Sequence, residues 1–81
     1  MTNPALAIQS LWPDASGRAV ADLLGYSQAQ WQAWTSGRVS PTADTIAEMR
    51  SRAARALPEG VALILIRDGE SWYVVTELED R

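Results

Sequence analysis

The chain has 81 residues, no cysteine, no histidine and a formal net charge of −3. Without cysteine it has no disulfides or thiolate metal sites, and without histidine it lacks the commonest general base and metal ligand. No paired-carboxylate motif takes their place, so we expect no catalytic residues, no metal and no cofactor, and a protein that is not an enzyme. The longest apolar run, residues 61–66, is too short to cross a bilayer, and no export signal is visible, so we expect one soluble cytoplasmic domain.

Charge is distributed unevenly along the chain. Residues 1–57 carry five arginines against four carboxylates, whereas residues 58–81 carry two arginines against six carboxylates. The acidity therefore belongs to the C-terminal part, and the N-terminal part is nearly neutral.

The N-terminal part predicts two helices before its first glycine turn. Asn3 and Pro4 are a helix-start signal for residues 5–12, with Leu6, Leu11 and Trp12 expected in the core, and Pro13 ends that helix. A short polar loop then leads to a second helix over residues 17–24.

Gly25 interrupts the helical pattern, and a third helix follows it. Ser27 opens this helix, Gln30 stands at capping-box spacing, and Gly37 is typical of a helix end near Ser36. A fourth helix begins at Ser40 or Thr42 and continues to residue 57. Its buried face is predicted to comprise Ile46, Met49, Ala53 and Leu57, and Arg50, Arg52 and Arg55 are interpreted as solvated.

The pattern changes after a hinge at residues 58–60. Residues 61–66 and 71–78 are rich in β-branched and aromatic side chains, and Asp68-Gly69 between them predicts a hairpin with a type I′ turn. Centring on that turn pairs Leu65 with Trp72 and Leu63 with Val74. The predicted fold class is α+β, with four to five short helices followed by a C-terminal hairpin.

The arrangement from Ala21 to Pro41 resembles the phage-repressor-like (Cro/XRE-type) helix-turn-helix family. A small residue, Ala21, stands four before the turn glycine Gly25, and Trp34-Thr35-Ser36-Gly37-Arg38-Val39-Ser40-Pro41 resembles the family's run after the second helix. The sequence departs from the family at Thr35, where an acid is common, and at the bulky Trp31. The resemblance implies a DNA-binding region over residues 1–57, with residues 58–81 as a dimerisation element of the same compact domain.

The resemblance also implies which residues contact DNA. Trp31 faces the core, and the opposite face of the third helix supplies the expected base contacts, Gln28, Ala29, Gln32 and Ala33. Expected phosphate contacts are Ser16, Gly17, Arg18, Ser27, Trp34 and Arg38.

The apolar hairpin predicts a subunit interface. Two copies could pair their hairpins across a two-fold axis through Leu63, Leu65, Trp72 and Val74. The expected function is a sequence-specific double-stranded DNA-binding repressor that binds an inverted-repeat operator as a homodimer. The alternative is an antitoxin-like or phage-type interaction protein whose acidic hairpin binds a protein partner, with DNA binding secondary or absent.

Overall fold

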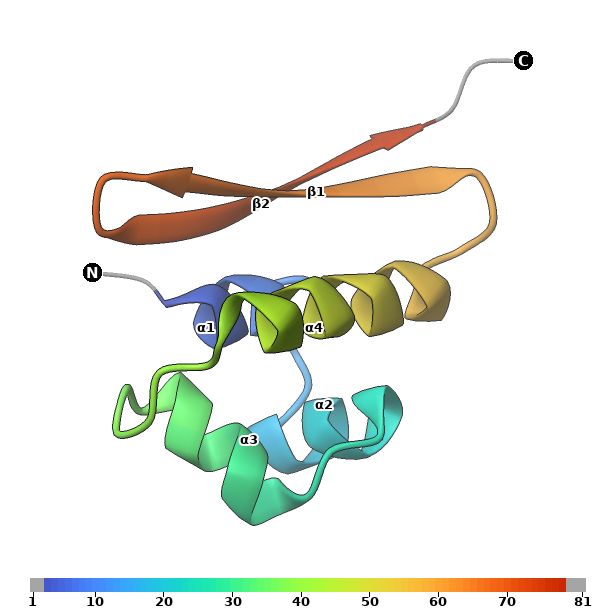
Figure 1. The fold of residues 1–81 in the computed structure, drawn as a ribbon. Coiled ribbons are helices and arrows are strands. Elements are labelled where there is room, and N and C mark those ends of the chain that lie inside the picture. Colours follow the sequence, from blue (N-terminus) through green and yellow to red (C-terminus); the bar gives the residue numbers. More distant parts are fainter. Residues whose placement is uncertain (1–2, 79–81) are drawn as a thin grey trace.

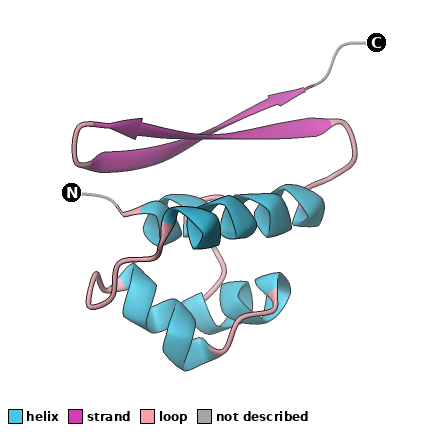
Figure 2. Cartoon of the chain, viewed as in Figure 1, coloured by secondary structure: helices cyan, strands magenta, loops and turns pink. Residues whose placement is uncertain are grey.

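A computed structural model describes residues 3–78 and confirms the α+β class, with four helices and a C-terminal antiparallel hairpin (Figures 1 and 2). The elements are α1 (Pro4–Gln9), α2 (Gly17–Leu24), α3 (Gln28–Thr35), α4 (Ala43–Ala56), β1 (Val61–Asp68) and β2 (Ser71–Leu78). They form three layers in Figure 1: the hairpin lies over α1 and α4, and α2 and α3 lie on the other side of those two helices.

Each helix begins at a polar capping residue. The Oδ1 atom of Asn3 accepts a hydrogen bond from the backbone of Leu6 at 2.8 Å, and the hydroxyls of Ser16, Ser27 and Thr42 accept from backbone amides at 3.1–3.2 Å. These bonds satisfy amides that have no partner inside their own helix. Thr42, rather than Ser40, is thus the cap of α4.

The first helix is shorter than the sequence predicts. It begins at Pro4 and ends at Gln9, and the backbone amides of Leu11 and Trp12 make turn bonds to the carbonyls three residues before them. The prediction of Leu6 as core is wrong, because that side chain is 36% exposed and Ile8 is fully buried instead. Leu11 and Trp12 pack at the edge of the core.

The core joins all four helices to one face of the hairpin. Trp31, Met49, Ile8 and Val20 are its largest fully buried side chains. Tyr26 stacks on Trp31 with ring centroids 5.8 Å apart, and Trp34 meets both rings edge to face. Aromatic side chains bury large areas, so this cluster fixes α3 against the rest of the molecule.

The hairpin register differs from the prediction. The turn lies one residue further along the chain, so each residue of β1 pairs two positions further along β2 than predicted. Asp68 pairs with Ser71 and Leu65 with Val74, so the two turn residues are Gly69 and Glu70. Gly69 has a φ of +63° and Glu70 does not have a positive φ, which is the pattern of a type II′ turn. A type I′ turn centred on Asp68-Gly69 would place Asp68 in the left-handed region, and the type II′ turn requires that conformation only of glycine.

One hairpin face covers the helices, and this corrects the predicted interface. Leu63, Leu65, Trp72 and Val74 do share a face, but Leu63 is 6% exposed within the core and Leu65 and Val74 pack against that core. The prediction of these four as dimer contacts is therefore wrong in its choice of face. The other face, here called the outer hairpin face, carries Ala62, Ile64, Ile66, Tyr73 and Val75.

Candidate nucleic-acid interface

Helices α2 and α3 are joined by a three-residue turn built on Gly25. This residue has a φ of +82°, its amide donates to the carbonyl of Asp22, and the amide of Tyr26 donates to the carbonyl of Ala21 at 2.9 Å. This pair of bonds is a Schellman motif, which closes a helix and turns the chain sharply. The result is the helix–turn–helix arrangement that the glycine predicted.

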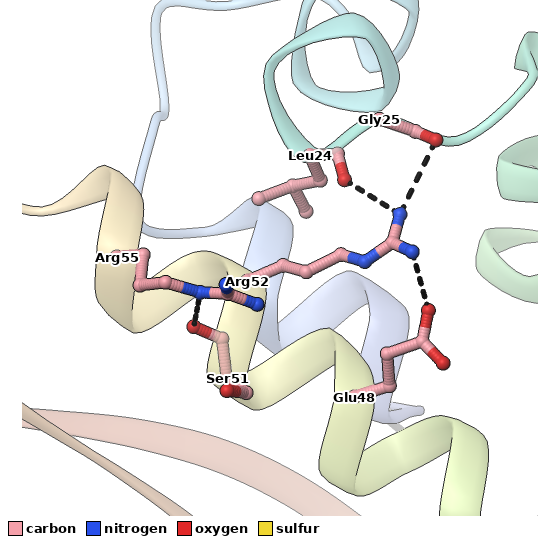
Figure 3. Close-up of polar contacts among 6 residues, drawn as sticks. All are labelled: Leu24, Gly25, Glu48, Ser51, Arg52 and Arg55. Carbon is pink, nitrogen blue, oxygen red and sulfur yellow. Dashed lines mark hydrogen bonds and ion pairs between the residues drawn. The ribbon is translucent and has the colours of Figure 1, made fainter.

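Arg52 of α4 holds this turn, as Figure 3 shows. Its Nη1 donates to the carbonyls of Leu24 and Gly25 at 3.0 and 3.2 Å, and its Nη2 lies 2.6 Å from Glu48. Its guanidinium also lies 4.5 Å from the centre of the Tyr26 ring. The interpretation of Arg52 as a solvated surface arginine is therefore wrong. It donates hydrogen bonds to carbonyls at the C-terminal end of α2, and its positive charge stabilises the negative end of that helix dipole.

Tyr26 lies between Arg52 and the tryptophans. Its hydroxyl oxygen is buried and has no hydrogen-bond partner among the residues that the structure describes. Burial raises the pKa of Tyr26 above its usual 10.0, while the nearby Arg52 lowers it and Glu48 raises it. Tyr26 thus packs beneath the turn, and its ring makes a cation–π contact with the guanidinium of Arg52.

A groove runs between the beginning of α2 and the exposed side of α3. It has a volume of about 320 Å³, and it is here called the α2–α3 groove; its lining comprises Gln9, Ser16, Gly17, Arg18, Gln28, Trp31, Gln32 and Thr35. The structure thereby brings two predicted base contacts, Gln28 and Gln32, beside three predicted phosphate contacts. The backbone amides at the start of α2 and the Arg18 guanidinium are donors suited to phosphate oxygens.

Gln9 is a member of the groove that the sequence prediction did not include. Its Oε1 accepts a hydrogen bond from the indole Nε1 of Trp31 at 2.8 Å. The same oxygen would lie 3.4 Å from a Cβ added at Gly17, which is ordinary van der Waals contact, so Gln9 packs directly against the start of α2. This bond ties α1 to α3 directly behind the groove.

The predicted DNA contacts that do not line the α2–α3 groove include both exposed and buried residues. Ala29 and Arg38 are exposed, and the Ser27 hydroxyl caps α3 at the backbone amide of Gln30. Ala33 is 5% exposed and cannot reach a base, so that prediction is wrong. Trp34 is 7% exposed and does not line the α2–α3 groove, which corrects its assignment to a phosphate.

A second and larger hollow of about 470 Å³ lies where the start of α1, the α3–α4 loop and the tip of the hairpin meet. Among the residues that the structure describes, Arg67 is the one cation in its lining, and this side chain lies over the Trp72 ring and donates from Nε to the carbonyl of Gly69 at 3.1 Å.

Two absences apply to residues 3–78, the part of the chain that the structure describes. Over that range, acidic side chains do not gather into a group of three that could hold a metal ion. No helix within it combines the length and apolar character needed to span a membrane.

The chain was compared with family models, curated proteins and solved structures, and none of them matches it.

Proposed function

We propose that the protein is a sequence-specific double-stranded DNA-binding transcriptional repressor. The observation that carries the proposal is the α2–α3 groove, where two exposed glutamines of one helix stand beside the amino end of another and an arginine. In a helix-turn-helix the second helix enters the major groove and the first approaches the backbone. Gln28 and Gln32 have the donor and acceptor pair that matches adenine N6 and N7.

The affinity for DNA is expected to depend on few charged side chains of the protein. Arg18 is exposed and lines the proposed interface, Arg38 is exposed in the loop after α3, and the amides of α2 add dipolar attraction without net charge. Each phosphate contact made by an arginine contributes about 0.9 to the slope of log affinity against log salt. Replacement of Arg18 by Gln is therefore expected to weaken binding to all sequences alike and to lower that slope by about 1.

The experiment begins with selection of bound duplexes from a random double-stranded library, followed by gel shift in a salt series. The variant that combines Gln28→Ala and Gln32→Ala is expected to lose the selected preference and to keep weak general binding. Each lost base contact, at about 1–3 kcal/mol, corresponds to roughly 5- to 150-fold in affinity for the selected site.

Gln30→Ala is the matched control, because Gln30 is an exposed glutamine of the same helix that does not line the groove. This variant should select and bind as the parent protein does. Failure of the protein to bind any duplex at low salt contradicts the proposed function. An unchanged preference in the double variant contradicts the assignment of the two glutamines.

A further inference from the structure

Gln9, at the end of α1, reaches the α2–α3 groove from outside the two helices that form it. This side chain is partly buried and lies against the start of α2. A Cβ added at Gly17 would be 3.4 Å from its Oε1 and 4.0 Å from its Nε2. Both amide atoms therefore lie beside the helix that approaches the DNA backbone in a helix-turn-helix.

The indole of Trp31 fixes the orientation of the Gln9 amide. An indole Nε1 can only donate a hydrogen bond, so the amide atom that faces it at 2.8 Å must be the carbonyl oxygen Oε1. Trp31 is 1% exposed, and a buried indole N–H without an acceptor is costly, so the flipped orientation is strongly disfavoured. The other half of the amide, Nε2, is thereby held as a donor in a fixed place.

The Nε2 group is free to bind something outside the chain. It makes no hydrogen bond within residues 3–78. In that range the Tyr26 hydroxyl is the one buried side-chain polar atom without a partner, so Nε2 is open to solvent. The groove that Gln9 lines is therefore the place where this donor is available.

We propose that Gln9 is a DNA-binding residue whose Nε2 donates a hydrogen bond to a phosphate oxygen. This inference rests on the proposed function and adds a contact from α1 to those of α2 and α3. A phosphate oxygen fits because the neighbouring groups, the start of α2 and the Arg18 side chain, are donors as well. A glutamate at this position would accept from Trp31 equally well but would present a negative charge to the phosphate, whereas the amide serves both partners.

The neutral donor distinguishes this contact from one made by an arginine. Gln9→Met keeps the length of the side chain and removes its hydrogen bonds. It should weaken binding to every duplex roughly 10-fold, as expected for loss of a hydrogen bond to a charged group. The slope of log affinity against log salt should stay unchanged, because no cation is lost, whereas Arg18→Gln should lower it by about 1.

Gln9 also ties α1 to α3, and two variants separate that tie from the contact with DNA. Gln9→Glu keeps an acceptor for the indole, so the Trp31 Hε1 resonance in an NMR spectrum should be preserved while affinity falls at least 10-fold. Asn3→Ser keeps a cap for α1 but removes the bond from Asn3 Nδ2 to the Thr35 carbonyl, which ties α1 to the end of α3 at 3.0 Å away from the groove. Asn3→Ser should bind every duplex as the parent protein does.

Duplexes with one neutral phosphate test the contact directly. Gel shifts use the selected duplex with a single methylphosphonate linkage, placed at each position in turn, which replaces a phosphate oxygen by a methyl group. At one position the replacement should cost the parent protein roughly 10-fold more affinity than it costs Gln9→Met, because the two changes remove the same interaction. Circular dichroism checks that each variant is folded.

The outcomes distinguish the contact from the function on which it rests. A parent protein that binds no duplex contradicts both. Parent-like affinity of Gln9→Met, or equal methylphosphonate losses for the two proteins at every position, overturns the contact and leaves the proposed function standing. An equal loss in Asn3→Ser, or a changed sequence preference in Gln9→Met, shows that α1 acts by placing α3 and likewise overturns the contact.

Discussion

Replacement of Gly25 by Ala tests the link between the turn and α4. With a φ of +82°, Gly25 occupies the left-handed region, which costs a residue with a Cβ about 1–2 kcal/mol. The added Cβ would lie 3.2 Å from Nη1 of Arg52, so the guanidinium must move by a few tenths of an ångström. That shift weakens its two bonds to the carbonyls of Leu24 and Gly25, and because the Arg52 side chain is 34% exposed we add only about 0.5–1 kcal/mol.

The expected loss in the free energy of unfolding is therefore about 1.5–3 kcal/mol, measured by urea titration with circular dichroism. For a chain of this size this lowers Tm by roughly 6–24 °C. Gly60→Ala is the matched control, because Gly60 has a φ of +85° and a Cβ there would meet nothing within 4 Å. It should lose only the backbone part, about 1–2 kcal/mol.

The difference between Gly25→Ala and Gly60→Ala in the free energy of unfolding measures the cost of the contact between the added Cβ and Arg52. Combining Gly25→Ala with Arg52→Met should abolish that difference, because the side chain being displaced has lost its guanidinium. Equal losses in the Gly25 and Gly60 variants, or an excess loss that persists beside Arg52→Met, would refute the reasoning.

Two further changes probe the same region. Arg52→Met should destabilise the protein by about 1–2 kcal/mol in urea titration, because it leaves two carbonyls at the end of α2 without their donor; Glu48→Gln should cost less than about 0.5 kcal/mol, because that ion pair is 34% and 51% exposed. A larger effect from Glu48→Gln would contradict this ranking. Tyr26→Phe should leave stability at pH 7 unchanged or raise it by up to about 1 kcal/mol, because it removes a buried hydroxyl without a partner. Since the folded protein raises the pKa of Tyr26, ionisation of this tyrosine opposes folding: the neutral form is present in both states below pH 10.0, and stability falls as the pH rises through the higher folded pKa. Tyr26→Phe should therefore show a smaller fall in stability above pH 10, and an identical alkaline decline would contradict the assignment.

Local signals in the sequence were sufficient to predict most of the fold. Ser27 caps the helix that it precedes, Gly25 takes the positive φ of the turn, and Met49 and Ala53 line the buried face of α4. Each of these depends on neighbours within a turn or two of the chain, so the residue types predict the outcome.

Most of the parts that were predicted wrongly depend on contacts between distant segments. The turn is an exception, because Asp68-Gly69 is compatible with two turn types and the observed one requires a positive φ only of glycine. The shared face of Leu63 and Val74 was predicted, but which side of the ribbon meets the helices is a tertiary property. Arg52 stands four residues after Glu48, a spacing that indicates only a helix ion pair, and its bonds to carbonyls 27 and 28 residues earlier leave no local trace.

The contacts of Arg52 have a consequence for how binding specificity can change. Arg52 recognises the turn through the carbonyl oxygens of Leu24 and Gly25, which any sequence in the same backbone conformation provides. The exposed side chains of α3 take no part in those bonds. Residues such as Gln28 and Gln32 can therefore be exchanged while α4 continues to hold the turn and the hairpin stays packed on α1 and α4. The fold separates the exposed glutamines of α3 from the elements that support that helix, so exchange of Gln28 and Gln32 tests the proposed DNA specificity without removing a contact that holds the turn.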